Sequence, residues 1–536
     1  MPIPAPGTAW PPAPWDFAYK AFAENDAWYT GDTDALAKMY TRASGEAAAT
    51  HTHRGQPMRG GLVGAASRMF WGRPVPVGEN RARLHVPAPA DLATLASDLV
   101  FAEPPDVKLA KGTSSKAATP GTATPTDPTQ DRLDLIANGD EAHATFNQMG
   151  ELKSALGATA LVVRWDTAVA DHVWLEPSAA DVIIPTFRSG RMVECTLWTE
   201  YIDGNVYYRH LEHHAVGAIE HALYAGTADN LGRRVPLQDR PETAGIAQLV
   251  DENSLILTGI DRLTAVYNPN MPTAKWRKMG QLAYTGRSDF AQLHPLFDSL
   301  DETFSSWIRD LRQGAGKILV PDSMLDFGVI GGGGTFDMGR EIFAGLNAPG
   351  DPTKIALEKV QFEIRVEQHE RTAFGLYREI LRKAGFSQSA WGDYTGAKAS
   401  GAMTATEVED RDKASERTRD KKILNDRVAI AQAASVALEI DGKIFPGKGG
   451  GKFDLPTVVF PDVSQEDPEK LARTLNLLDT ASAISLEQKV RRANPDWEDE
   501  QILAEVRAIR SERVAPDPAT FTGDPDEDPV DDLENA

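Results

Sequence analysis

Two amphipathic helix patterns, separated by a glycine-studded segment, constrain the fold of this chain most strongly. In residues 288–312, apolar side chains recur at steps of three and four residues, which places them on one helix face. Residues 367–386 return to the same period. Gly385 stands where a helix C′ residue is expected, and Phe386 is available for the accompanying apolar contact. We therefore expect two long helices joined by a small module.

The start of the first helix is open to two interpretations. Ser288 suits an N-cap and Asp289 suits the first turn, whereas Pro295 is expected to kink the helix or to mark its true start. The segment also carries several acids: Asp289, Asp298, Asp301, Glu302 and Asp310.

Between residues 158 and 224 the apolar period changes to two, which is typical of short strands separated by turns. Asp203-Gly204 is a hairpin signal within this stretch. The alternation of strand and helix that builds a parallel sheet is not present. We therefore expect an α+β chain with an antiparallel sheet, and not a doubly wound nucleotide-binding fold.

Helical and extended patterns are expected elsewhere too. Thr404 and Glu407 form a capping box, which predicts a long helix to about Ile440 that ends at Asp441-Gly442. Strands are expected at 361–366 and 455–460. Further helical segments are expected at 15–43, 91–101, 132–156, 466–480 and 496–512.

Three segments have the composition of poorly ordered chain. Residues 1–14 are rich in proline and are expected to be extended and disordered. Residues 111–129 contain few bulky apolar side chains, and residues 514–536 form an acidic tail without a base.

Bulk properties exclude several classes of protein. Of the 536 residues, 41% are hydrophobic, which is ample for burial. The one cysteine, Cys195, cannot form an internal disulfide, which fits a reducing cytoplasm. We expect neither a signal peptide nor a membrane partner, because no basic and apolar leader is visible and no apolar run approaches the ~18 residues of a spanning helix.

The net charge of −22 argues against tight DNA binding, because such proteins neutralise phosphates with Lys and Arg. It is compatible with a wall past which DNA slides, since an acidic surface repels a polyanion. Charge alone does not separate such a conduit from a protein that never meets DNA.

Candidate catalytic motifs fail on their spacing. Gly314–Lys317 suggests a phosphate loop, but Leu311 occupies the first glycine position of that motif and Ile318 replaces its hydroxyl residue. Glycines 331–334 lack the context of a dinucleotide fingerprint. We expect no enzymatic activity and no cofactor.

A group of histidines leaves two interpretations open. It consists of His210, His213, His214 and His221. In an extended strand His210 and His214 share one face and His213 lies opposite, so a metal site would need a ligand from a neighbouring strand. Packing or hydrogen bonding within the sheet is the alternative, and we expect no metal.

Several strings, in this order, resemble portal proteins of tailed double-stranded DNA bacteriophages, especially those of long-tailed phages that infect actinobacteria. They are AWYTGD (27–32), RMFWGRPVP (68–76), RLHVPAPADLATLASDLVFAEPP (83–105), YYRHLEHHAVGAIEHALYAGTADNLGRRVPL (207–237), GRSDFAQLHPLFDSLDETFSSWIRDLRQGAGKILVP (286–321), IRVEQHERTAFGLYREILRKAGFS (364–387) and GAMTATEVEDRDKASERTRDKK (401–422). The resemblance spans about residues 15–513, and no single string is a catalytic fingerprint.

The resemblance implies a ring-forming portal architecture of wing, stem, clip and crown. Its parts would be a wing at 15–285 (helical at 15–157, antiparallel sheet at 158–285) and 404–462, stem helices at 286–313 and 361–385, a clip at 314–360, a channel loop at 386–403 and a crown at 463–513.

It also implies roles for individual residues. Stem packing would fall to Leu300, Phe304, Trp307, Leu311, Leu376 and Ile380. The DNA channel would be lined by Asp298, Asp301, Glu302, Trp391, Asp393, Tyr394 and Lys398. Docking at the clip would involve Lys317, Gly331, Gly332, Gly333, Gly334 and Phe336. The alternatives are that the stem acids form a solvated helix face and that Lys398 lies in an ordinary surface loop.

The implied function is a ring, usually of twelve copies, through which duplex DNA passes without sequence specificity during packaging and ejection. Its implied partners are the terminase large subunit, head-completion or adaptor proteins, and the major capsid and scaffolding proteins. Its location would be the portal vertex of the virion, after assembly in the host cytoplasm. The alternative is another head component, such as a minor capsid or adaptor protein.

Overall fold

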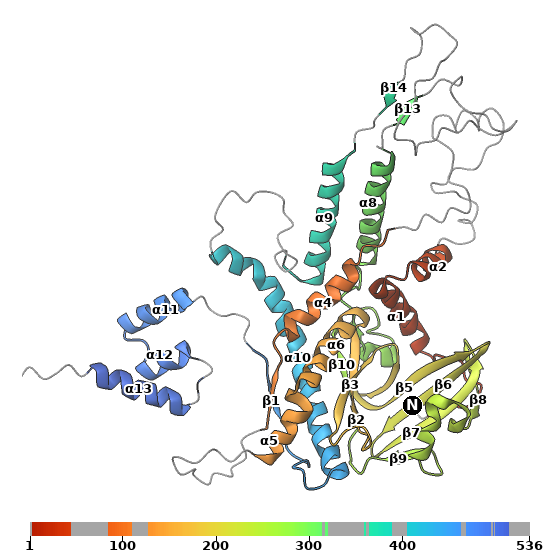
Figure 1. Cartoon of the computed structure of the whole chain (residues 1–536), viewed down its shortest axis with the longest axis horizontal. Helices are drawn as coiled ribbons and strands as arrows, with labels where there is room; N and C mark the ends of the chain where they lie inside the picture. The colour runs from red at the N-terminus through yellow and green to blue at the C-terminus, as the bar shows by residue number, and fades with distance from the viewer. Residues whose placement is uncertain are drawn as a thin grey trace, which may run out of the picture. The chain divides into compact units, whose positions relative to one another are not determined.

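The computed structural model describes residues 3–43, 84–109, 127–313, 317–319, 358–360, 364–387, 405–461, 468–494, 497 and 499–513. The chain divides into two compact units, residues 1–460 and 461–536. The first unit contains all the described strands and the two long helices expected around the glycine-studded segment (Figure 1).

The strand-rich region of the first unit forms two antiparallel sheets, so the antiparallel pairing is confirmed but the single sheet is not. The larger sheet has the order β4-β5-β6-β7-β8, and β9 also pairs with β7. Its strands are β4 (Ile183–Arg188), β5 (Arg191–Asp203), β6 (Val206–Ala215), β7 (Ala218–Thr227), β8 (Asn230–Val235) and β9 (Leu255–Leu257). The smaller sheet has the order β10-β2-β3, with β2 (Ala158–Arg164), β3 (Trp174–Ala179) and β10 (Ala265–Pro269).

The hairpin expected at Asp203-Gly204 is confirmed. Asp203 pairs with Val206 across the turn between β5 and β6. Gly204 has a φ of 58°, in the left-handed region that a glycine adopts without a steric penalty. The turn therefore sets the register of the β5–β6 pair.

The N-terminal segment, expected to be disordered, instead packs on the larger sheet over its described residues. Gly7 N donates to Gly232 O, Leu231 N donates to Thr8 O, and the buried Trp10 packs edge-on against Trp198 at 5.5 Å. Proline-rich composition predicts an extended backbone, but here the edge of the sheet supplies partners for that backbone.

Helices cover the sheets and complete the core. The helix expected over 15–43 is two helices, α1 (Trp15–Thr30) and α2 (Thr33–Ala43), because Gly31 ends the first and the Asp32 carboxylate accepts from the backbone of the second. The next helices are α4 (Ala88–Phe101), α5 (Pro128–Leu133) and α6 (Asp140–Leu156), with a π-helical turn at Asp134–Asn138.

The long helix α10 (Ala405–Ile444) passes through the position where the sequence predicts its end. Asp441 is fully buried, and its carboxylate accepts from Arg132 Nε at 2.7 Å and from Arg132 Nη2 at 2.8 Å. Because Arg132 compensates the buried Asp441 carboxylate, Asp441 does not have to lie in a solvent-exposed turn. The helix therefore continues to Ile444. Thr404 of the expected capping box lies outside the described residues.

The two amphipathic patterns form α8 (His294–Gln313) and α9 (Val366–Ala384). Pro295 marks the true start of α8, so the start at Ser288 is wrong. The expected C-terminus of α9 is confirmed, since Gly385 has a φ of 89° and Phe386 N donates to Leu381 O. The strand expected at 361–366 is wrong over its described residues, because residues 364 and 365 are not in a strand and α9 begins at Val366.

Short elements complete the described chain. They are β1 (Asp106–Lys108) paired with β15 (Thr457–Val459), β11 (Met271–Pro272) paired with β12 (Gly286–Arg287), β13 (Lys317–Leu319) paired with β14 (Glu358–Val360), α7 (Pro241–Ala244), and 3-10 turns at Leu237–Asp239, Ile246–Gln248 and Gly280–Tyr284.

The second unit contains α11 (Pro468–Thr480), α12 (Leu486–Ala493) and α13 (Asp499–Arg513). The sequence predicted two helices here and missed α12, whose short length of eight residues gives little periodicity. Val490 of α12 packs with Ile502 and Val506 of α13. Across both units, the described helices include none with the length and apolar character needed to span a bilayer.

Candidate functional site

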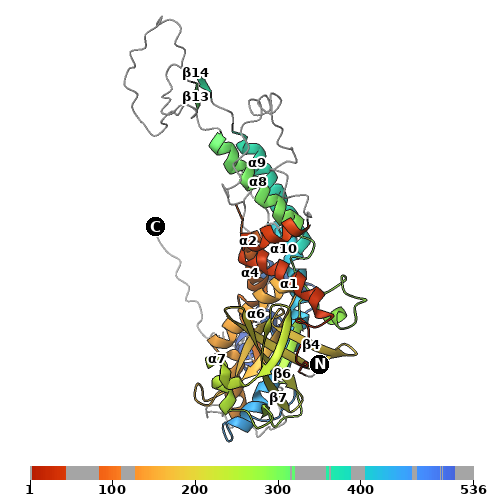
Figure 2. The ribbon, with the colours of Figure 1, turned by 90° about the vertical axis from the view of Figure 1, so that its right-hand side faces the viewer.

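The helix pair α8–α9 is the candidate functional site. The helices lie side by side in both views (Figures 1 and 2), and the antiparallel pairing of β13 with β14 follows them. We call the end formed by His294 and Ala384 the base, and the end formed by Gln313 and Val366 the tip.

The base of the pair is embedded in the largest hydrophobic core. Leu300 and Ile380 are fully buried there, and Phe304 and Leu376 pack against the same core from partly buried positions. These four side chains therefore pack within the subunit, and the stem role that the resemblance implies for them stays a prediction. Leu311 was expected to join them, but its side chain is 43% exposed because α8 has risen beyond the core by that position.

The tip is held by an aromatic stack and an ion pair. Trp307 stacks on His369 with ring centroids 6.0 Å apart and planes 9° apart. The Asp310 carboxylate accepts from His369 Nε2 at 2.9 Å and from Arg365 Nη2 at 2.8 Å. The bond from His369, followed by Arg365, lowers the pKa of Asp310 against the opposing effect of burial. Trp307 also packs against Phe304, with ring centroids 5.9 Å apart, so it contacts both helices of the pair.

The acids expected to line a channel mostly have partners within the subunit. Asp301 is buried, and its carboxylate contacts His85 Nδ1 at 3.0 Å and accepts from Val86 N at 2.9 Å. Its assignment to a channel wall is therefore wrong, because the chain before α4 needs this carboxylate. Of the other proposed wall acids, Asp298 is half-buried and Glu302 is exposed.

The exposed surface of α9 carries several bases, whereas the acids of α8 had suggested an acidic wall. Arg371, Arg378 and Arg382 are all exposed. Arg371 and Arg382 form ion pairs with Glu367 and Glu379 on the same helix. A uniformly acidic wall is therefore not what this pair presents.

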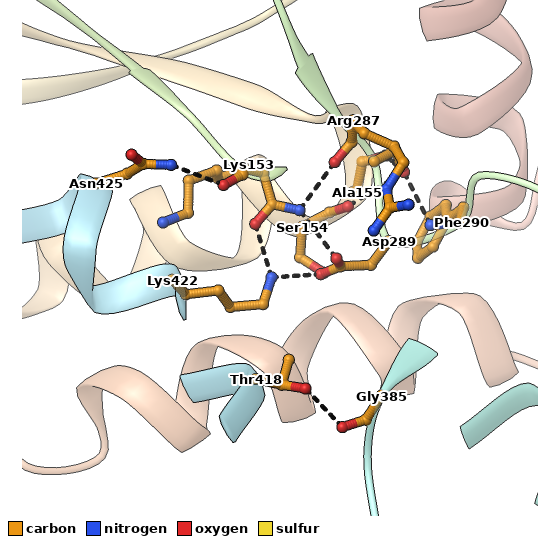
Figure 3. Close-up of polar contacts among 12 residues, drawn as sticks. Lys153, Ser154, Ala155, Arg287, Asp289, Phe290, Gly385, Thr418, Lys422 and Asn425 are labelled. Atoms are coloured by element: carbon orange, nitrogen blue, oxygen red, sulfur yellow. Dashed lines mark hydrogen bonds and ion pairs between the residues drawn. The ribbon is translucent and has the colours of Figure 1, made fainter. Parts of the chain in front are cut away.

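A buried polar network ties the start of α8 to α10 (Figure 3). Lys422 Nζ of α10 donates to Asp289 Oδ2 at 2.5 Å and to Asn270 Oδ1 at 2.7 Å. The Asp289 carboxylate also accepts from Ser154 Oγ at 2.7 Å and from Asn270 Nδ2 at 2.9 Å. Asp289 was expected in the first turn of α8, but it lies five residues before the helix and serves as its anchor.

The end of α9 is tied to the same helix. Thr418 Oγ1 of α10 donates to Gly385 O at 2.6 Å (Figure 3). One turn earlier on α10, Ser415 Oγ accepts from Ser387 N at 2.8 Å. Both chain connections at the base of the pair therefore converge on residues 415–422 of α10.

Another buried ion pair holds α10 against α6. Lys153 of α6 contacts Asp426, which also accepts from Asn268 Nδ2 at 2.8 Å. Burial lowers the pKa of Lys153, and Asp426 opposes that shift. The paired carboxylate therefore favours the charged lysine that burial disfavours.

Sequence reasoning missed these anchoring residues, although a signal was present. Three charged residues recur at steps of three and four residues along α10: Arg419, Lys422 and Asp426. They lie on the same face as the apolar Ile423, and all four side chains are buried. Charged residues that occupy core positions of a helix indicate buried partners.

The histidine-rich strands form hydrogen bonds within the sheet. His210 Nε2 lies 3.1 Å from His221 Nδ1 in a stacked pair, and burial lowers the pKa of His221 to about 4. Burial disfavours the Glu212 carboxylate, but Arg164 and His214 outweigh it and hold the pKa of Glu212 well below its usual range. The described residues contain no group of three side chains placed to hold a metal.

Several sequence-predicted site residues cannot be placed. Those of the expected channel loop and clip that lie outside the described residues are Trp391, Asp393, Tyr394, Lys398, Gly331, Gly332, Gly333, Gly334 and Phe336. Lys317 lies in β13, where only the backbone is described.

Comparisons with known proteins yield structural matches only. No family model matches the chain, and no curated protein matches its sequence. One solved structure, the neck of an empty gene transfer agent particle with C6 symmetry, matches with a TM-score of 0.39 and 14% identity over 81% of this chain and 94% of its own.

Two more solved structures come from such particles. The virion of a native gene transfer agent particle gives a TM-score of 0.37 and 14% identity, covering 81% of this chain and 99% of that chain. The neck of a native particle with C12 symmetry gives a TM-score of 0.35 and 13% identity, covering 87% of this chain and 98% of that chain.

Proposed function

We propose that this chain is a portal protein, one subunit of a ring through which double-stranded DNA enters and leaves a phage-like capsid. The proposal is supported by the ordered strings that resemble portal proteins and by the helix pair that those strings predict. The observation that supports it most directly is that α8 and α9 pack side by side and are both anchored at their base to α10.

The proposed role requires a rigid helix pair. A wall around moving DNA must keep its shape under load, and helices packed along a shared apolar face form a stiff element. Leu300 and Ile380 supply that face at the base, and the buried contacts to Lys422 and Thr418 fix both chain connections to one long helix. The proposed role requires no catalytic centre and no cofactor.

The charge of the pair modifies how DNA would pass. Asp301 and Asp310 are engaged inside the subunit, while Arg371 and Arg378 are exposed on α9. A surface of mixed sign makes weak and rapidly exchanging contacts with phosphates and gives no sequence readout. We propose sliding contact with the duplex, and not purely repulsive passage.

The partners follow from the same proposal. A terminase large subunit would dock at the 314–360 module during packaging, and head-completion or adaptor proteins would replace it. Capsid and scaffolding proteins would surround the ring at the vertex of the virion, after assembly in the host cytoplasm.

The test is electron microscopy of the purified full-length chain. We expect class averages of closed rings with a central opening wide enough for a duplex, with about twelve copies. Particles that remain single subunits at high protein concentration, or compact oligomers without an opening, would overturn the proposal and favour another head component.

A further inference from the structure

The exposed side of α10 carries an unusual combination of cations and aliphatic side chains. Leu424 is 64% exposed and Val428 is 55% exposed, one helical turn apart. Three exposed cations surround them: Arg417, Lys421 and Arg427. We call these five residues the basic–apolar face.

The cations of this face have no partner among the described residues, although the chain carries a net charge of −22. Over residues 417–428, where the side chains are described, Asp420 is the exposed acid among them. The opposite side of the same helix packs on the core through Ile423 and Ile430, so the face sits on a rigid support. An apolar centre with a charged rim is typical of a protein interface and not of a phosphate-binding surface.

A surface of complementary chemistry lies at the other end of α10, on α5, the π-helical turn and the start of α6. Leu135 is 48% exposed there. Exposed acids surround it: Asp131, Asp134, Asp140 and Glu141. The one base within residues 127–142, Arg132, is buried against Asp441. We call Leu135 and these four acids the acidic–apolar surface.

The two surfaces cannot meet within one subunit. Arg132 fixes α5 beside Asp441, which is 17 residues from Leu424 along α10, a separation of about 25 Å at the helical rise of ~1.5 Å per residue. Figure 1 shows α5 beside the C-terminal end of α10, away from the end where α10 meets α9. The complementary pair is therefore available to two different copies.

We propose that the basic–apolar face of one copy binds the acidic–apolar surface of the next copy. A contact between two different surfaces is heterologous, which is the kind of interface that builds a ring when its rotation closes. The inference rests on the ring proposed above and adds to it the surfaces that hold the ring together. The charges steer and align the contact, and Leu424, Val428 and Leu135 supply its apolar centre.

The experiment reverses charges in the full-length chain and measures the ratio of rings to subunits by mass photometry. Arg417→Glu with Lys421→Glu should lower that ratio by about tenfold or more, because acids would then face acids. Adding Asp131→Lys and Glu141→Lys to the same chain should restore rings, since every copy carries both surfaces. Arg233→Glu with Lys278→Glu makes the same change of net charge at exposed sites elsewhere and should leave the ratio unchanged.

Thermal melting of each variant shows that the subunit itself remains folded. Rings that persist in the Arg417→Glu, Lys421→Glu chain would overturn the inference. An equal loss of rings in the control chain would overturn it too, as would a chain with all four reversals that does not form rings again. A wild-type chain that forms no rings would instead defeat the proposed function, so the two failures are distinguishable.

Discussion

The base and the tip of the α8–α9 pair are held by opposite kinds of interaction. At the base, Lys422 and Asp289 are buried among hydrogen-bond partners and flank a continuous apolar core. At the tip, Asp310 meets Arg365, whose side chain is 62% exposed, beside the stack of Trp307 on His369. Buried pairs are costly to break, whereas exposed pairs contribute little. The pair is therefore expected to be rigid where it joins the body and easier to open at its tip.

The largest effect should follow from breaking the buried ion pair at the base. Lys422→Met leaves the Asp289 carboxylate buried without its cation and should lower the free energy of unfolding by about 3–5 kcal/mol. Chemical denaturation followed by circular dichroism measures it. Lys278→Met, at an exposed lysine, is the matched control and should change stability by less than about 0.5 kcal/mol. Equal effects of the two variants would remove the distinction between base and surface.

The apolar contacts should show the same gradient along α8. Leu300→Ala removes a fully buried side chain and should cost about 2–5 kcal/mol through lost burial and the cavity left behind. Leu311→Ala makes the same chemical change at an exposed position nearer the tip and should cost less than about 0.5 kcal/mol. Chemical denaturation measures the free energy of unfolding of both variants. A comparable decrease at the two positions would contradict a core confined to the base.

The tie between α10 and the end of α9 should have an intermediate effect. Thr418→Val keeps the shape of the side chain but removes the hydrogen bond to Gly385 O, which should cost about 1 kcal/mol. The rate of backbone amide hydrogen exchange should rise at the C-terminal turn of α9. The control variant Thr372→Val changes an exposed threonine of α9 and should leave that rate unchanged.

The smallest effect is expected at the tip. Asp310→Asn should lower stability by no more than about 1 kcal/mol. Because the pKa of Asp310 is lowered in the folded chain, its contribution is present above the unfolded pKa and is lost as pH falls through the folded one. The difference in melting temperature between wild type and Asp310→Asn should therefore vanish in acid. A difference that persists at low pH would assign the effect to packing.

Local chemistry in the sequence determined much of this fold. The three- and four-residue recurrence of apolar side chains predicted α8 and α9, and Pro295 and Gly385 marked two of their ends because each restricts or permits particular backbone angles. Asp203-Gly204 predicted the hairpin for the same reason. The apolar stripe of each helix predicted a buried face, and the resemblance implied that Leu300 and Ile380 pack there.

Only the tertiary structure decided which charges are internal. The period of α8 places Asp301, but not the exposed Glu302, on the apolar face, yet it does not show which segment pairs with that carboxylate. The fold supplies the partner, which is the chain before α4. Asp441 was expected to end a helix, and Lys422 was not singled out at all, because their partners Arg132 and Asp289 come from segments more than 100 residues away. A charged side chain becomes an anchor or a surface group according to what packs against it, and that contact is made between segments which local sequence patterns treat separately.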